Sequence, residues 1–355
     1  FVLAFIAILI LSVPVGLSLL REHNLAAYEA DGKVLADLGY VMSWDEVEFP
    51  PMDADVQARW KAWCKGVDNV QGPLQTWWNK PTLPIPDGAL NLLRERRRKL
   101  SIGLECLRIG VVANMSADLA SLDHSADHAS TIHIEVLMAL REIAAFYRAE
   151  ALTSQDPSQA LSGLDQLDSS LGKPLLVIDL MIASAIAEKR DEAWLQAVQS
   201  KRVTSIQTQA WLEDGQDWVE RTRHAWMGER LWSTSYMNFL DEAPDPFKPT
   251  SWYWSAVAPI EANHQRHSLA TLEASLGALP PPPPIRGIIP HTPILSSISI
   301  PNLKESLHTI AERATTGRIK RLAARLHLDH HDGKPWPFDE AAFLKDWAAQ
   351  GRLGG

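Results

Sequence analysis

The chain has 355 residues, 46% of them hydrophobic, which is enough apolar side chain to build one large or two ordinary cores. Its formal net charge of −9 gives no overall basic field to attract nucleic acid or anionic lipid. Composition and charge therefore exclude a largely disordered protein, and we expect no nucleic-acid partner.

The first segment is apolar and long enough to cross a membrane. Phe1–Leu20 carries no charged side chain, and about 1.5 Å of rise per helical residue takes it across a bilayer core of about 30 Å. Pro14 and Gly16 are tolerated in membrane helices more readily than in soluble ones. The alternative is a cleaved signal peptide, but Leu25-Ala26-Ala27 is a poor cleavage site because the charged segment Arg21–His23 stands directly before it. We therefore predict a transmembrane anchor.

The anchor also predicts a location. An uncleaved N-terminal anchor usually leaves the large domain outside the cytoplasm, so we expect a single-pass inner-membrane protein whose large domain is periplasmic. The chain begins with Phe rather than Met, and we expect further residues to precede it. In that compartment Cys64 and Cys106 could form a disulfide, and the alternative is that both are small buried hydrophobic side chains.

Residues 21–112 predict a set of N-terminal helices around a loop rich in Pro and Trp. Residues 21–45 continue the first helix beyond the membrane. The density of Gly and Pro in residues 66–88 favours irregular structure around Trp77-Trp78. A further helix is expected from Asp87 to about Val112.

Residues 113–279 carry the clearest helical periodicity and form the predicted central domain. One apolar stripe runs from about Asp127 to Leu152. Asp156-Pro157 starts the next helix with a capping acid and a proline at the first helical position. The helix after Lys173-Pro174 is apolar nearly all round, which predicts a central place. Two further helices, at 204–214 and 217–240, precede an irregular stretch at 243–255.

The remaining segments are a Pro-rich linker, residues 280–302, and a C-terminal helical segment, residues 303–355. The proline run Pro280–Pro284 must be extended polyproline II, and a stiff spacer is favoured over a ligand for a proline-reading domain. The rest of the linker is expected to be irregular or a short strand, and helices are expected at 303–328 and 338–347. The predicted fold is mainly α: a single N-terminal transmembrane helix followed by a helical bundle or short α-solenoid with Pro-rich irregular segments.

A candidate metal site lies at the start of the central domain. On a helix His124 and His128 would share one face, as paired imidazole ligands require, and Asp127 adds a carboxylate. However, the pattern lacks the Glu of an H-E-x-x-H site, and the acids are also suited to capping the following helix. The metal site is thus one interpretation and a helix start the other.

Two other clusters are less specific. Asp329 to Asp332, with two histidines between the acids, is interpreted first as a polar turn, and a metal site is the alternative. Glu261, His264 and His267 would form a site only if folding brings them together. No nucleophile elbow, P-loop, dinucleotide fingerprint or EF-hand loop occurs, so we predict no cofactor, and an enzyme is the less favoured interpretation.

The order of several features carries a family resemblance. They are the N-terminal anchor, Phe49-Pro50-Pro51, the helix at 128–152, the Asp156-Pro157 helix, and Lys173-Pro174-Leu175-Leu176 with its apolar helix. Over about residues 1–240 this order resembles a group of uncharacterised membrane-anchored helical proteins of planctomycete and verrucomicrobial bacteria. The resemblance implies architecture and compartment and supplies no catalytic residues.

A short C-terminal segment carries a second, weaker resemblance. His331-Asp332-Gly333-Lys334-Pro335 is similar to the His-Gly-x-x-Pro-like turn found in the same group and in type II secretion pseudopilins. An inserted Asp interrupts the pattern here, and the Asp-Pro-Phe segment expected downstream is absent. These two departures weaken the case for a pilin-like role.

We expect the function of an extracytoplasmic, membrane-anchored helical scaffold that binds a protein partner in the envelope. One alternative is a metal-dependent hydrolase that uses the cluster at residues 123–128. Another is a protein that binds cell-wall polysaccharide through Trp77-Trp78 and Trp252-Tyr253-Trp254, because indole rings stack on sugar rings.

Overall fold

The structure, a computed structural model, describes residues 2–47, 54–108, 126–214, 217–238, 249–277, 279–286 and 294–333. Within these ranges the chain forms eleven α-helices and one short 3₁₀-helix and has no β-strand, which confirms the predicted mainly α class. The elements are α1 (Val2–Asp37), η1 (Trp44–Glu46), α2 (Ala54–Cys64), α3 (Gln75–Asn79), α4 (Ala89–Arg108), α6 (Ala126–Thr153), α7 (Ser158–Ser170), α8 (Val177–Gln199), α9 (Ser205–Glu213), α10 (Trp218–Asn238), α11 (Pro249–Ser275) and α12 (Ile294–His331).

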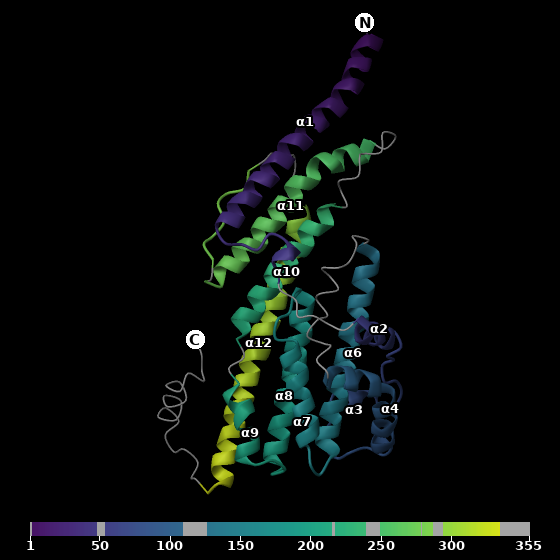
Figure 1. Ribbon diagram of the computed structural model, residues 1–355, viewed down its shortest axis with the longest axis vertical. Coiled ribbons are helices and arrows are strands. Elements are labelled where there is room, and N and C mark those ends of the chain that lie inside the picture. The colour runs from purple at the N-terminus through teal and green to yellow at the C-terminus, as the bar shows by residue number, and fades with distance from the viewer. Residues whose placement is uncertain are drawn as a thin grey trace.

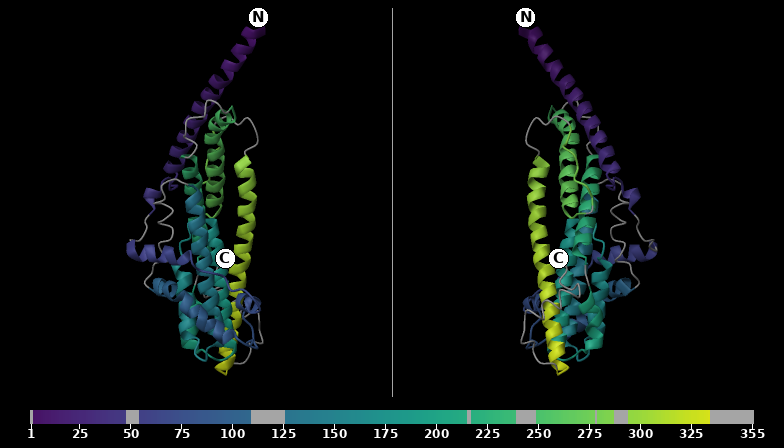
Figure 2. Two further views of the ribbon diagram at one scale, coloured as in Figure 1. Left: turned by 90° about the vertical axis from the view of Figure 1, so that its right-hand side faces the viewer. Right: turned by 90° about the vertical axis from the view of Figure 1, so that its left-hand side faces the viewer.

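The molecule is elongated, and its helices form two connected groups (Figures 1 and 2). One group, at the upper end in Figure 1, is built from α1, α11 and part of α10. The other contains α6, α7 and α8 with α9 and α12, and α2, α3 and α4 lie on its side. Both α10 and α12 contact α8 and α11, so they join the two groups.

Helix α8 occupies the central place that its sequence predicts. Its side chains are buried on several faces, and it packs against α6, α7, α10 and α12. Leu180, Ala183 and Ile186 are each 0% exposed. A helix that is apolar nearly all round can only be stable where other helices cover most of it, and α8 is covered except at its start, where Ile178 is 41% exposed.

The starts of the predicted helices are also found. Asp156 accepts a hydrogen bond from the backbone N–H of Ser158 (3.0 Å), so its carboxylate satisfies one of the free amide donors at the start of α7. Thr204 caps α9, accepting from the N–H of Gln207 at 3.3 Å. The buried side of α7 contains Leu161, Leu164 and Leu167.

Three segments differ from the sequence-based expectation. The five residues of α3 lie in a stretch expected to be irregular, because a helix of little more than one turn is too short to show a period. Helix α11 starts at Pro249, inside the expected irregular stretch, where proline is accepted as a first helical residue. Helix α12 starts at Ile294, inside the expected linker, although its Ser and β-branched residues have modest helix propensity. The helix expected at 338–347 lies outside the described residues.

The segment expected to be the membrane anchor lies at the start of helix α1. Residues 2–20 form the first half of α1, which continues without a break to Asp37. In the described part of the chain, no helix combines the length and the hydropathy that a membrane span requires.

Both cysteines are free thiols in the main core. Cys64, at the end of α2, and Cys106, in α4, are each at most 3% exposed and belong to the same apolar cluster. Burial raises the pKa of both thiols above the ordinary value. They act as small hydrophobic side chains, which is the second of the two interpretations of the sequence.

Candidate functional site

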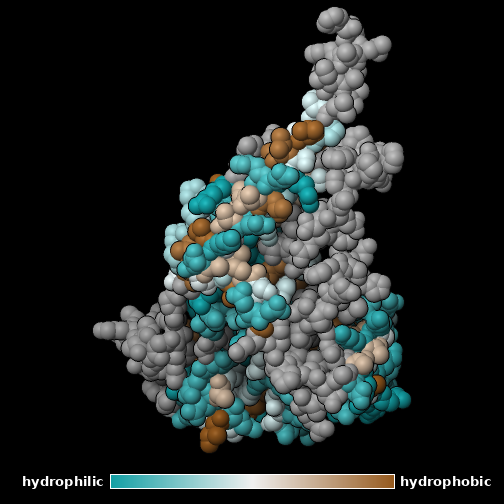
Figure 3. Space-filling model, turned by 45° about the horizontal axis from the view of Figure 1, so that its top comes forward, coloured by the Kyte–Doolittle hydropathy of each residue, from teal (hydrophilic) through white to brown (hydrophobic). Residues whose placement is uncertain are grey.

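Residues 12–20 of α1 carry apolar side chains that the rest of the structure leaves largely exposed. Of residues 12–20 none is buried, and Val13, Val15 and Leu19 are 52%, 60% and 62% exposed. Apolar surface is visible at this end of the molecule in Figure 3, and Figures 1 and 2 show α1 reaching beyond the other helices there. This is the part of the described surface where large apolar side chains are concentrated along one segment.

The second half of α1 is fixed to the body along one face. Its buried residues are Asn24, Ala27, Asp31 and Leu35, spaced three or four apart, and this face packs on α11. The character of α1 therefore changes near the charged segment at residues 21–23, from an exposed apolar helix to a helix that is part of the core.

Polar contacts set the register between α1 and α11. The side-chain amide of Asn24, 0% exposed, donates to the carbonyl of Ala256 (3.0 Å). The amide of Asn263 donates to Asp31 Oδ2 at 2.7 Å. Because both contacts are buried, sliding one helix along the other would leave these polar groups without partners, at a free-energy cost.

A buried arginine adds to this attachment. Arg266 of α11 is 2% exposed, and its Nη2 donates to the carbonyl of Tyr28 in α1 (2.6 Å) and to Asn263 Oδ1 (2.7 Å). Its guanidinium carbon lies 4.0 Å from the centre of the Tyr28 ring, which is a cation–π contact. The two helices are thus joined by charge and hydrogen bonds as well as by apolar packing.

The proline run folds back on these two helices. We call residues 280–286 the proline segment. Near its start the hydroxyl of Tyr40 donates to the carbonyl of Pro280 (2.8 Å). At its end the backbone N–H of Arg286 donates to Asp31 Oδ2 (2.9 Å). The segment is therefore held at both ends by residues that follow or belong to α1.

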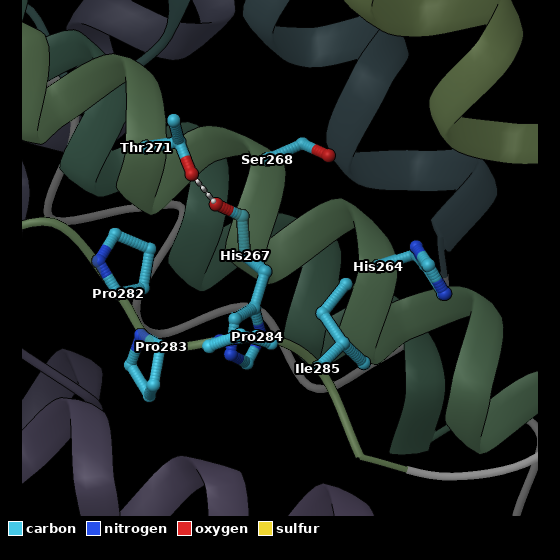
Figure 4. A pocket seen from close by; sticks show the side chains of 8 residues that line it. All are labelled: His264, His267, Ser268, Thr271, Pro282, Pro283, Pro284 and Ile285. Atoms are coloured by element: carbon cyan, nitrogen blue, oxygen red, sulfur yellow. Dashed lines mark hydrogen bonds between the residues drawn. The ribbon is translucent and has the colours of Figure 1, made fainter.

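A cavity of about 560 Å³ lies between α11 and the proline segment. It is lined by His264, His267, Ser268, Thr271 and residues 282–285 (Figure 4). The weakly indicated group Glu261, His264 and His267 is thus brought together only in part. Figure 4 shows the His264 and His267 side chains pointing in different directions, and Glu261 is buried without lining the cavity.

The predicted metal site stays a prediction. Asp127 and His128 lie in the first turn of α6, as expected for a helix start, but their side chains are not described, and His124 lies outside the described residues. Among the described residues, no three His, Cys, Asp or Glu side chains are placed to hold one ion.

The second histidine cluster ends a helix. Asp329, His330 and His331 are in the last turn of α12, and the backbone N–H of Asp332 still donates to the carbonyl of Leu328 (2.9 Å). The carboxylate of Asp329 lies 3.5 Å from Arg325 Nε. The expected turn therefore begins later than the sequence indicates.

The tryptophans that the polysaccharide-binding alternative would use are described only in part. Trp77 and Trp78 are 8% and 1% exposed, and their ring N–H groups donate to Thr82 O (3.0 Å) and Glu142 Oε2 (3.2 Å). Rings buried in this way have no free face for a sugar, so this pair belongs to the core. The side chains of Trp252 and Trp254 are not described.

A buried ion network is the feature that sequence reasoning missed. Arg190 of α8 contacts Asp168 of α7 (2.5 Å), which also accepts from Arg221 of α10 (3.1 Å). Asp168 and Arg190 are 1% and 3% exposed. Next to them Trp211 of α9 donates to Asp191 Oδ1 (2.7 Å). Charged residues within otherwise apolar helices were the available signal, and the network now explains how four helices keep their relative positions.

No family model matches the chain, and neither the curated proteins nor the solved structures contain a match.

Proposed function

We propose that the protein is a helical scaffold tethered to a lipid bilayer by residues 1–20, with its helical body outside the cytoplasm and available to a protein partner. The observation that carries the proposal is the division of α1. Its first half has an uncharged sequence, with exposed apolar side chains in the described residues 12–20, and its second half is built into the core.

The bilayer is the partner that best fits the first half of α1. Exposed apolar surface is unfavourable in water by roughly 25 cal/mol per Å², and acyl chains would cover it from every side. Phe1–Leu20 has no charged side chain, so insertion requires no desolvation of charge. A protein groove could cover only one face of the helix, whereas Val13, Val15 and Leu19 do not lie on a single helical stripe.

The attachment of α1 would fix the orientation of the helical body relative to the tether. Since α1 is one helix from Val2 to Asp37, the orientation of the lipid-bound half is passed directly to the second half. The contacts of Asn24, Asp31 and Arg266 then fix the orientation of α11 relative to α1. The body is thereby held at a defined orientation to the membrane surface, which suits a protein that presents a surface to a partner.

Vesicle flotation tests the tether. The full chain is reconstituted with neutral phosphatidylcholine vesicles, and the variant carrying Val15→Asp and Leu19→Asp is compared with it. An aspartate at the centre of a membrane helix costs about 3 kcal/mol, and less towards its end, where Val15 and Leu19 lie. Two aspartates together should still reduce partitioning at least about tenfold, so we expect the double variant to stay at the bottom of the gradient.

The matched control is Ile206→Asp on α9. Ile206 is 83% exposed and far from α1 in the fold, so this variant should float like the unchanged chain. Equal flotation of the double variant and the unchanged chain would contradict the tether, as would an unchanged chain that does not float.

A further inference from the structure

We propose that the proline segment is a docking strip for a partner protein domain whose groove is lined by aromatic rings and carries a carboxylate at one end. The docking strip rests on the proposed scaffold function and specifies the class of partner that the scaffold binds. The observation behind it is an exposed edge of proline rings that ends at an exposed arginine.

The conformation of the proline segment follows from its five consecutive prolines. Each ring fixes φ at about −65°, and each of residues 279–283 precedes a proline, which keeps it out of the α-helical region. All peptide bonds of the segment are trans, and none of its residues belongs to a helix. The run is therefore a polyproline II helix, which has no internal hydrogen bonds and leaves its carbonyl groups open to outside donors.

The edges of this helix differ in exposure. Since it has about three residues per turn, residues three apart lie on the same edge. Pro282 and Ile285 share one edge, are half-buried and line the cavity beside α11 (Figure 4). Pro281 and Pro284 share the next edge and are exposed, although Pro284 also borders the cavity. The segment thus turns one edge towards the body and presents another, formed by proline rings, to the outside.

Arg286 adds a positive charge at the end of the exposed edge. Its Nε lies 3.4 Å from Asp31 Oδ1, but 60% of its side chain is exposed. A guanidinium has five donor hydrogens, so Arg286 can bind a second carboxylate from outside while it keeps this contact. Pro281, Pro284 and Arg286 form the pattern P-x-x-P-x-R. Because the charge is at one end only, it would fix the direction in which the partner binds.

A groove lined by Trp and Tyr side chains is the surface that best fits this edge. Grooves of this kind bind P-x-x-P segments, because proline rings are apolar and their helix is already formed. The ring N–H of Trp and the hydroxyl of Tyr can also donate to the open carbonyl groups. The ends of the segment are held by Tyr40 and Asp31, so little chain entropy is lost when the partner binds.

Titration with an SH3 domain that reads P-x-x-P-x-R peptides tests the docking strip. The full chain in nanodiscs is added to the fluorescently labelled domain, and anisotropy gives the affinity. A free peptide of residues 279–286 is the reference. Because the segment is ordered before binding, we expect the chain to bind at least as tightly as the peptide. The same domain with its groove Trp replaced by Lys should not bind the chain.

Two adjacent prolines provide a matched pair of variants. Pro281→Ala removes two apolar carbons from the exposed edge and should weaken binding roughly tenfold, whereas Pro282→Ala, on the edge towards α11, should change it by less than about twofold. Arg286→Ala keeps the backbone N–H that donates to Asp31 and removes the charged pair with the partner, so it should also weaken binding roughly tenfold. Arg98→Ala, at an exposed position on α4, should bind like the unchanged chain.

Two results would overturn the docking strip. One is an unchanged chain that binds the domain more than about tenfold more weakly than the free peptide, and it requires no variant to fold. The other is an equal loss for Pro281→Ala and Pro282→Ala. Flotation and titration fail separately: a chain that floats but does not bind contradicts the docking strip alone. A chain that does not float is titrated without nanodiscs, and binding then supports the docking strip and leaves only the tether contradicted.

Discussion

Two carboxylates of α7, Asp168 and Asp165, differ in how well neighbouring groups compensate the burial of their charge. Asp168 is buried but faces two arginines, Arg190 and Arg221. Asp165, three residues earlier on α7, lies 3.8 Å from Arg190 Nε and accepts from the Trp194 ring N–H (3.1 Å). Because desolvation outweighs these contacts, burial raises the pKa of Asp165 to about 6, and the neighbouring Asp168 adds to the shift.

This shift predicts a pH dependence of stability. Between about pH 4 and pH 6 the folded state keeps the proton of Asp165, whereas the unfolded chain, with a pKa of about 3.9, has lost it. The contribution of Asp165 to stability therefore falls as the pH rises through this window. Asp165→Asn removes the effect and keeps an acceptor for Trp194, so at pH 7 it should be more stable than the unchanged chain by about 1 kcal/mol, a value reduced for the solvent screening of a partly exposed group.

Thermal unfolding followed by circular dichroism at pH 4 and pH 7 measures this difference. The two proteins should have the same midpoint at pH 4 and separate at pH 7. Asp156→Asn is the control with the opposite sign, because hydrogen bonds from Ser158 lower the pKa of Asp156, and its contribution is lost as the pH falls. A constant difference for Asp165→Asn at both pH values would show that its carboxyl does not titrate as described.

The elements of the fold were predictable where a period or a cap could be seen. Helix α8 was assigned and placed correctly because its apolar pattern continues for several turns, and α7 because Asp156 and Pro157 mark its start. Helix α3 was missed because five residues show no period, and the start of α12 because its Ser and β-branched residues have modest helix propensity.

The candidate site was less predictable than the helices. His264 and His267 are three residues apart on α11, but the cavity they line exists only because the proline segment folds back on that helix. The contacts that hold the segment join residues more than 200 positions apart, such as Tyr40 with Pro280 and Asp31 with Arg286. No local pattern reports such contacts, so a stiff linker was the natural expectation from the proline run.

The packing of α10 on the segment before α8 gives a prediction at the scale of elements. A Cβ added at Gly228 would lie 1.7 Å from the carbonyl oxygen of Leu175, so α10 would have to move away from Leu175. Gly228→Ala should destabilise the protein by about 1–3 kcal/mol, seen as a lower thermal midpoint. Gly16→Ala in α1 is the matched control, because nothing lies within 4 Å of the added carbon, and its midpoint should be unchanged or slightly higher. Equal midpoints for the two variants would show that α10 and Leu175 are not in close contact.

At the scale of the whole molecule, the arrangement is a helical body continuous with the apolar first half of α1. The body is joined internally by the ion network around Arg190 and by α10 and α12, which contact helices of both groups. Helix α1 is joined to it by buried contacts of Asn24 and Asp31. If the first half of α1 is in lipid, the membrane and the body form one mechanical unit, and the cavity beside α11 is held close to the bilayer surface.

The environment of the two halves of α1 tests this arrangement most directly. Nitroxide labels are attached in nanodiscs to Val15→Cys in the first half and to Lys33→Cys, an exposed position in the second half. Cys64 and Cys106 are buried, so the introduced thiol is the reactive one. We expect the label at position 15 to collide with dissolved oxygen and be shielded from a water-soluble nickel chelate, and the label at position 33 to show the reverse. A label at position 15 that meets the nickel chelate as freely as the label at position 33 would contradict a lipid-bound tether.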